Sequence, residues 1–366
     1  MEKLLVNNMK KVRESNFELL RCILMFMVVL VHYNNVDMGK ALAYVTPGTL
    51  NYYFVYFMES LSIIGTNGFV LLTGYFSWKK EKVSLRKPFG LLLYVSAYGM
   101  LFYLINLVFL NEPFSMRSFV LNMIPRNWYI TLYIVLMLIS PAINIVIKNI
   151  KKEAYISLLI VMFLMFSVWP TIIDVVAGCF GINTSGINTI SNIGSANGYS
   201  IVNFVLLYMI GAAISKLDIL RYSIVLDILG YIVCSILICA QHIIVGYGWS
   251  YANPLVIVSC VLFFNIFRKI HLASRWINEL SKASLGVFLI HTNYLVSGYA
   301  WSKIGIQQAC QGGMVGLAVH MLVSCLITYV LCSLFDITCR WLTKPISKML
   351  DKINCLKKTI IYISET

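Results

Sequence analysis

The stretch FELLRCILMFMVVLVHY (Phe17–Tyr33) decides the class of fold. It is long and apolar enough to cross the roughly 30 Å hydrocarbon core of a bilayer as a helix. It nevertheless carries Glu18 and Arg21 near one end and His32 near the other. Because ionisable groups are costly inside a lipid-spanning helix, they usually face a cavity or a pathway. The stretch therefore predicts a membrane protein and indicates where its function lies.

Composition supports the same interpretation for the whole chain. Of its 366 residues, 59% are hydrophobic and only 12% are charged, and the mean hydropathy is +0.80. Soluble domains have about 25% charged residues, so a soluble protein is excluded. The ten cysteines stand singly, without a C-x-x-C pair. They are expected to be small lipid-compatible side chains, and neither a metal site nor a disulfide framework is predicted.

Apolar runs recur along the chain, and the predicted fold is an all-α polytopic membrane protein with about ten transmembrane helices. The expected spans cover residues 17–35, 52–76, 89–110, 128–147, 154–176, 199–214, 222–244, 253–267, 284–302 and 312–334. The expected organisation is a cytoplasmic leader (1–16), a transmembrane domain (17–334) and a basic cytoplasmic tail (335–366). We expect no cleavable signal peptide, because no small-residue cleavage pattern follows the first apolar run.

The net charge of +14 is explained by orientation rather than by nucleic-acid binding. With an inside N-terminus, 24 of the 29 basic residues fall in inside segments. The positive-inside rule then places both termini in the cytoplasm. The few outside basic residues are Lys40, Arg117, Arg126 and Lys303. The longest outside loop, Ala177–Ser200, has no charged residue and is expected to be a flexible connector or a cover over an outer cavity.

Arg21 and His32 are eleven positions apart, which places them on one helical face about 16 Å apart along the axis. Glu18, three residues before Arg21, is close enough to pair with it. Taken alone, Arg21 could be a snorkelling anchor at the inner headgroups, and His32 an interfacial histidine. Their shared face favours a lined path through the protein.

The chain resembles the membrane acyltransferase 3 family, bacterial integral-membrane O-acyltransferases of surface polysaccharides. The first span has the family's hallmark arginine and, ten intervening residues later, histidine (Arg21, His32). The segment GTNGFVLLTGYF (Gly65–Phe76) resembles the family's second span, with Thr73 in place of the usual serine. Later segments match in order: NWYITLYIVLMLISPAIN (Asn127–Asn144), FVLLYMIGAAISK (Phe204–Lys216) and SLGVFLIH (Ser284–His291).

The resemblance implies a cytoplasmic acyl-CoA, usually acetyl-CoA, as co-substrate, with no bound cofactor. Arg21, Arg86 and Lys87 are the expected donor-binding residues. Many members have two arginines, two residues apart, at the start of the third span, where this chain has only Arg86 and Lys87. Lysine binds phosphate as a point charge without arginine's planar fork, so the donor contacts at this site are expected to differ.

His32 is the predicted catalytic residue, because transfer to a sugar hydroxyl requires a base and histidine suits that task. An acyl-histidine intermediate is the open alternative. Glu59, inside the second span, is the second catalytic candidate, either orienting His32 or binding the sugar; an interfacial carboxylate is the alternative. Further candidates for acceptor contacts or structural roles are Trp128, Tyr129, Asp174 and His291.

The predicted function is O-acylation, in the first place O-acetylation, of a capsule, exopolysaccharide or lipid-linked glycan at the bacterial cell membrane. The expected partners are membrane lipid, acyl-CoA and the glycan acceptor, without nucleic acid. A flippase or exporter of lipid-linked glycans is the first alternative, but it would not need His32. A polymerase would more often have a large arginine-bearing outer loop, and a non-catalytic scaffold leaves the Arg21–His32 pair unexplained.

Overall fold

The computed structural model describes residues 14–109, 111, 113–125, 127–181, 198–293, 295–350 and 359–361. Predictions for most of the leader, for Arg126, for residues 182–197 of the long outside loop and for most of the far tail lie outside these residues. Within the described part, seven helical segments are long and apolar enough to cross a membrane, and two shorter apolar helices accompany them. The all-α polytopic membrane fold is confirmed, with seven to nine apolar helices instead of ten.

The elements follow one another along the chain, with the longest connection between α10 and α11. They are α2 (Ser15–Asn34), α3 (Ala41–Tyr44), α4 (Leu50–Ser62), α5 (Gly65–Ser77), β1 (Lys82–Ser84), α6 (Arg86–Phe109), α7 (Met116–Met123), α8 (Trp128–Asn149), α9 (Lys152–Phe163), α10 (Trp169–Phe180), α11 (Ile201–Leu217), α12 (Ile224–Val245), α13 (Pro254–Arg268), α14 (Arg275–Leu280), α15 (Ser284–His291), α16 (Trp301–Lys303), α17 (Ile306–Gln311), α18 (Met314–Leu350) and β2 (Thr359–Ile361). A π-helical turn, Leu164–Val168, joins α9 to α10, and a second one, Leu295–Ala300, precedes α16.

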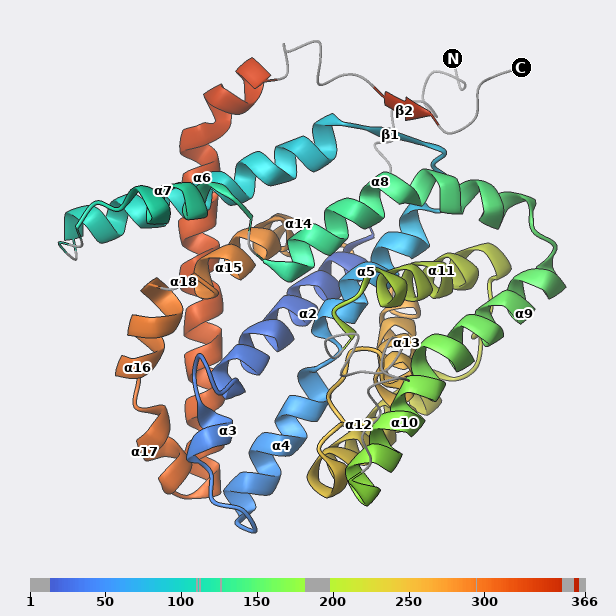
Figure 1. Ribbon diagram of the computed structural model, residues 1–366, viewed down its shortest axis with the longest axis horizontal. Coiled ribbons are helices and arrows are strands. Elements are labelled where there is room, and N and C mark those ends of the chain that lie inside the picture. The colour runs from blue at the N-terminus through green and yellow to red at the C-terminus, as the bar shows by residue number, and fades with distance from the viewer. Residues whose placement is uncertain are drawn as a thin grey trace.

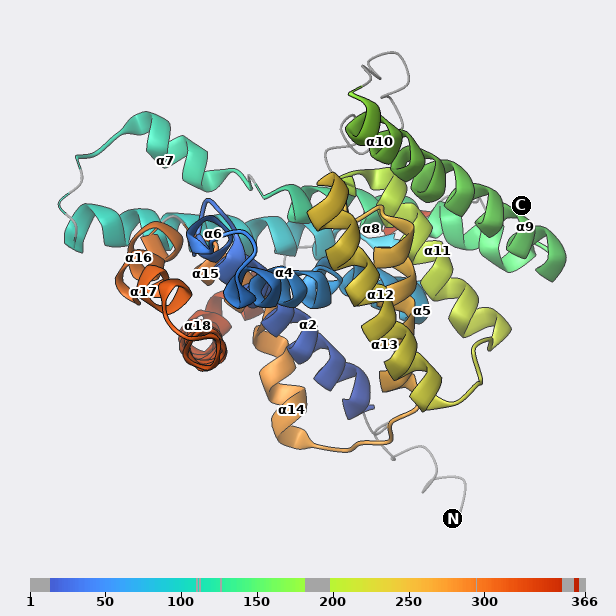
Figure 2. The same ribbon diagram turned by 90° about the horizontal axis from the view of Figure 1, so that it is seen from below.

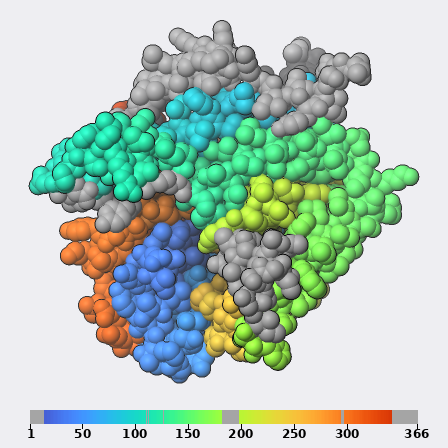
Figure 3. Space-filling model, in the orientation of Figure 1, coloured from blue at the N-terminus to red at the C-terminus, as the bar shows by residue number. Residues whose placement is uncertain are grey.

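Helix α2 is the central element of the bundle (Figure 1). It packs against α4, α5, α13, α15 and α18. Leu20, Leu24, Val29 and Tyr33 on α2 are at most 1% exposed. The first and last thirds of the chain therefore lie side by side, as the blue and orange surfaces in Figure 3 show. Because α2 is surrounded by other helices, its polar side chains face protein rather than lipid.

The outer helices present apolar side chains outward. On α12, Val225, Leu229 and Val233 are each more than half exposed, and their four-residue spacing places them on one face of the helix. Helix α12 stands at the edge of the bundle beside α13 (Figure 2). Such large exposed apolar surfaces are expected where lipid covers the protein.

Two glycines allow α5 and α11 to approach each other closely. A Cβ added at Gly74 would lie 2.0 Å from the carbonyl oxygen of Tyr208, and one added at Gly211 would lie 2.1 Å from that of Leu71. Helices in membranes commonly pack through such small residues. This contact explains why glycine is needed in the segment Gly65–Phe76.

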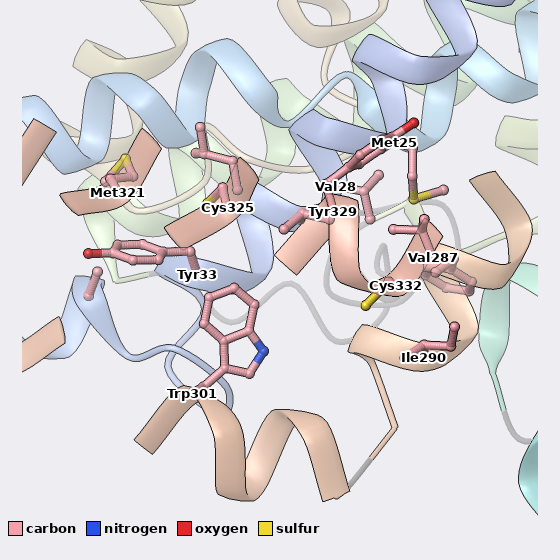
Figure 4. Packing of buried hydrophobic residues seen from close by; sticks show 14 of the residues in the cluster. Met25, Val28, Tyr33, Val287, Ile290, Trp301, Met321, Cys325, Tyr329 and Cys332 are labelled. Atoms are coloured by element: carbon pink, nitrogen blue, oxygen red, sulfur yellow. The ribbon is translucent and has the colours of Figure 1, made fainter. Parts of the chain in front are cut away.

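The predicted span at 284–302 is wrong as a single helix. The described part of this segment is divided into α15, a π-helical turn and α16. The interruption follows His291, where the Thr292 hydroxyl donates to the carbonyl of Phe288 and Asn293 follows. Threonine and asparagine compete for backbone hydrogen bonds in this way and favour helix ends. In Figure 4, Trp301 of α16 lies beside Tyr33 of α2, with ring centroids 5.9 Å apart.

The chain beyond residue 334 also differs from the expectation. Helix α18 continues to Leu350 instead of ending with its apolar run. An ion pair one turn apart, from Arg340 Nε to Asp336 Oδ2 at 2.7 Å, supports this continuation. Strand β2 then pairs antiparallel with β1, which ends two residues before Arg86. No strand was expected, because each strand has only three residues. A segment this short shows no alternation of apolar and polar residues that would distinguish it from the neighbouring helical sequence.

Candidate active site

Two adjoining cavities follow one face of α2. The larger has a volume of about 720 Å³ and includes His32 in its lining, whereas the smaller has about 250 Å³ and includes Arg21. Val28, Thr66 and Phe288 line both. The two predicted residues therefore lie at opposite ends of one lined path, called here the Arg21 end and the His32 end.

Besides α2, two helices, α6 and α15, run along the same path and line both cavities. On α6, Leu91 lines the smaller cavity and Asn106 the larger; on α15, Ser284 lines the smaller and Leu289 the larger. Both helices thus run from the Arg21 end to the His32 end. After α15, the described chain forms a π-helical turn and the short helices α16 and α17 instead of one long helix.

His32 is hydrogen-bonded to His291, whose side chain is fully buried. Nδ1 of His32 lies 2.7 Å from Nε2 of His291, and Nδ1 of His291 lies 2.5 Å from the carbonyl oxygen of Val287. A carbonyl only accepts, so the neutral His291 ring donates from Nδ1 and accepts at Nε2. His32 must then donate from Nδ1, which leaves the lone pair on its Nε2. The pair thereby selects the tautomer of His32 that accepts a proton at Nε2 rather than at Nδ1.

Arg21 is held by a buried carboxylate. Its Nη1 lies 2.7 Å from Oε1 of Glu18, whose side chain is only 5% exposed. The other carboxylate oxygen, Oε2, accepts a hydrogen bond of 2.5 Å from Ser281 Oγ. The predicted Glu18–Arg21 pair is present in the structure. Because the guanidinium also lines the smaller cavity, its position there is fixed by neighbouring side chains.

Arg86 and Lys87 begin α6 at the Arg21 end, because they precede Leu91 along that helix. Both are exposed, and neither is among the residues that line the two cavities. Lys80, in the connection before α6, lies near Lys87. Partial desolvation and, secondarily, the positive charge of Lys87 lower the pKa of Lys80. This end of the path is therefore positively charged.

Glu59 lies close to α2 but contacts a neighbour of His32 instead of His32 itself. Its Oε2 accepts a hydrogen bond of 3.0 Å from Asn34 Nδ2, and its side chain is buried. Glu59 is absent from the lining of the larger cavity. Among the described residues, the side chain that is hydrogen-bonded to His32 is that of His291. The sequence analysis had named Glu59 as a candidate for orienting His32.

The aromatic and acidic candidates divide between the two cavities and the core. Trp128 lines the larger cavity, whereas Tyr129 lines the smaller one. Thr73 also lines the smaller cavity, with its hydroxyl 3.1 Å from that of Tyr133, so the threonine retains the hydroxyl of the usual serine. Asp174 on α10 is fully buried and lines neither cavity.

Part of the larger cavity's lining was not expected from the sequence. Helix α7 doubles back against α6 (Figure 2) and contributes Ser118 and Asn122, opposite Tyr103 and Asn106 of α6. The only available signal was amphipathic spacing in a segment of eight residues, Met116–Met123. A helix this short is marginal on its own, so tertiary packing determines it.

The fold and the cavities define a polytopic membrane protein with an oriented histidine inside the helical bundle. Residues 14–336 match the acyltransferase 3 family, described as an acyltransferase domain. The chain belongs to this family, as its sequence motifs predicted, and is an acyl-transfer enzyme. No curated protein and no solved structure shows a significant match to the chain.

Proposed function

We propose that this enzyme transfers an acyl group, in the first place acetyl, from acyl-CoA in the cytoplasm to a hydroxyl of a cell-surface polysaccharide or its lipid-linked precursor. The observation that carries the proposal is the position of His32, which lies deep on a path that begins at Arg21. The bacterial cell membrane as location, and capsule or exopolysaccharide as acceptor, rest on the family resemblance.

In the proposed reaction His32 is the general base. Its Nε2 takes the proton of the acceptor hydroxyl while the oxygen attacks the thioester carbonyl. The carbon–sulfur bond then breaks, and the departing thiolate recovers that proton from the imidazolium, giving the ester and free CoA. His291 continues to accept from Nδ1 throughout, so it stabilises the imidazolium without exchanging a proton itself.

The positive charge at the Arg21 end supports binding of the donor's phosphates there. Arg21, Arg86 and Lys87 all lie at this end, and charge-assisted contacts to phosphate are among the strongest hydrogen bonds in proteins. The smaller cavity then offers an apolar passage for the donor's flexible arm. Its lining includes Met25, Phe69 and Phe288. The thioester would reach His32 while the nucleotide stays at the surface.

Substitution of His32 tests the proposal. His32→Ala and His32→Gln should abolish transfer of label from acyl-CoA to glycan in membranes matched for protein amount. Glutamine retains a hydrogen bond but is no base, so its inactivity separates proton transfer from packing. His271→Ala, at an exposed position, is the control and should remain active. Transfer at the normal rate by His32→Ala would remove this histidine from the reaction.

A further inference from the structure

We infer that the larger cavity is an acceptor subsite selective for an uncharged glycosyl unit. This inference rests on the proposed function, since it specifies the acceptor of that same reaction. It concerns charge: the cavity's described lining is suited to recognise hydroxyl groups and includes no cationic side chain to neutralise a carboxylate or a phosphate.

The described lining of this cavity is rich in polar groups but carries no fixed charge. Among the described residues that line it there is no aspartate, glutamate, lysine or arginine, and His32 is its only histidine. Five serine and threonine residues and four tyrosines are present. Five asparagines complete the polar set: Asn35, Asn106, Asn122, Asn127 and Asn293.

Several of these amides have hydrogen-bonding capacity left for a ligand. Oδ1 of Asn106 is buried and has no partner among the described residues. Asn127 uses Oδ1 to cap α8, accepting from the backbone N–H of Tyr129 at 3.0 Å, which leaves its Nδ2 as a donor. Asn35 likewise accepts from the N–H of Asp37 through Oδ1 at 2.8 Å. One unpaired acceptor and two amide donors therefore line the same cavity.

This chemistry suits a neutral sugar. Each sugar hydroxyl both donates and accepts, so amides and hydroxyls of the lining satisfy it in either sense. A carboxylate only accepts and carries a charge, and burying that charge without a cation to pair with it is costly. Among the described residues that line the two cavities, the only arginine is Arg21, which lies in the other cavity and is paired with Glu18.

An aromatic wall completes the subsite. The rings of Trp128 and Tyr199 are stacked, with centroids 4.1 Å apart at 17°, and Tyr251 lies 5.2 Å from Tyr199. Pockets that bind small ligands combine such apolar surfaces with a few placed polar groups. The volume of about 720 Å³ is in the range of about 300–1,000 Å³ typical of those pockets. A short glycan segment therefore fits together with the thioester.

The test compares matched acceptors. The probes are neutral trisaccharides of glucose, galactose or N-acetylglucosamine, and the same trisaccharides with one sugar replaced by its C6 uronic acid. With labelled acetyl-CoA, kcat/KM for the best neutral probe should exceed that for its uronate counterpart at least tenfold. Equal or better acylation of the uronate overturns the inference and leaves the proposed function standing. Label on no glycan of either kind overturns the proposed function.

A variant pair links this selectivity to the cavity. Asn106→Leu removes the unpaired acceptor at nearly constant volume, so KM for the neutral trisaccharide should rise about tenfold while KM for acetyl-CoA stays unchanged. Asn149→Leu is the matched control, because Asn149 is exposed at the end of α8, lines neither cavity, and donates to the carbonyl of Ile145 on its own helix. An unchanged acceptor KM in Asn106→Leu, or an equal rise in both KM values, contradicts the assignment.

Discussion

Nδ1 of His32 lies 2.7 Å from Nε2 of His291, across 259 positions of the chain. One imidazole orients the other, as a carboxylate orients the histidine of a hydrolase triad. The partner here is neutral and fully buried. The fold thus gives His32, the proposed general base, a fixed tautomer without placing a second charge inside the membrane.

Removing this orienting contact should slow the chemical step without affecting donor binding. In His291→Phe the ring volume is retained and the acceptor of the His32 Nδ1 proton is lost. A net hydrogen bond is worth about 0.5–1.5 kcal/mol, so kcat is expected to fall up to about tenfold, with KM for acyl-CoA unchanged. Initial-rate kinetics in membranes provide the measurement. His291→Gln, which still offers an acceptor, should recover part of the lost rate; failure of glutamine to do better than phenylalanine would contradict a positioning role.

The donor site can be tested at Arg21, provided that Glu18 is treated with it. Arg21→Gln alone leaves a buried carboxylate without its cation, which is destabilising by about 3–5 kcal/mol. Glu18→Gln/Arg21→Gln removes both charges and avoids that defect. Acyl-CoA affinity of the double variant should fall about tenfold to a hundredfold, because one charge-assisted contact is worth about 1.5–3 kcal/mol.

Glu18→Gln alone is the control for this experiment and should bind acyl-CoA at least as well as the unmodified protein. Arg86→Ala should also weaken donor binding, since Arg86 lies at the same end of the path. Donor affinity unchanged in both the double variant and Arg86→Ala would reduce these arginines to membrane anchors.

A methyl group at Gly286 should destabilise the protein and its active site together. A Cβ at Gly286 would lie 2.1 Å from Oδ1 of Asp336, which also accepts a hydrogen bond of 2.8 Å from Tyr98. Gly286→Ala should therefore cost about 1–3 kcal/mol of stability, as overpacked cores do. Because α15 carries His291 five residues later, activity should fall as well.

Thermal unfolding in detergent measures this effect, and Gly316→Ala is its control. Nothing lies within 4 Å of a Cβ at Gly316, on α18, where alanine favours the helix by up to about 1 kcal/mol. The prediction is a lower Tm for the first variant and an equal or higher Tm for the second. Equal Tm values for Gly286→Ala and the unmodified protein would contradict the prediction, because they would mean that α15 moves away from Asp336 without loss of stability.

The orientation of the chain is the last prediction. Reporter fusions after Lys87, after Lys152 and at the C-terminus should all report cytoplasm, because basic residues gather in these segments. A fusion within Ala177–Ser200 should report the outside. A cytoplasmic signal there would contradict the predicted topology, and an outside signal after Lys87 would place the Arg21 end on the wrong side for a cytoplasmic donor.

The sequence alone determined the class of fold, most helix positions and the shared face of Arg21 and His32. These features are local: the length of an apolar run, the helical repeat and the spacing of charges are all properties of one segment. Continuous spans were predicted most accurately for the same reason. The broken crossing after His291 was missed, because apolar residues flank its polar interruption and made it resemble one helix.

Only the tertiary structure decided which side chains meet. His291 with His32, Asn34 with Glu59, and α7 against α6 all join segments whose own patterns say nothing about their neighbours. An apolar face shows that a helix is buried, but not against which other helix it lies. Since a cavity is bounded by several helices at once, its lining follows from their packing and from no single stretch of the chain. The same holds for the lack of fixed charge among the described residues of that lining.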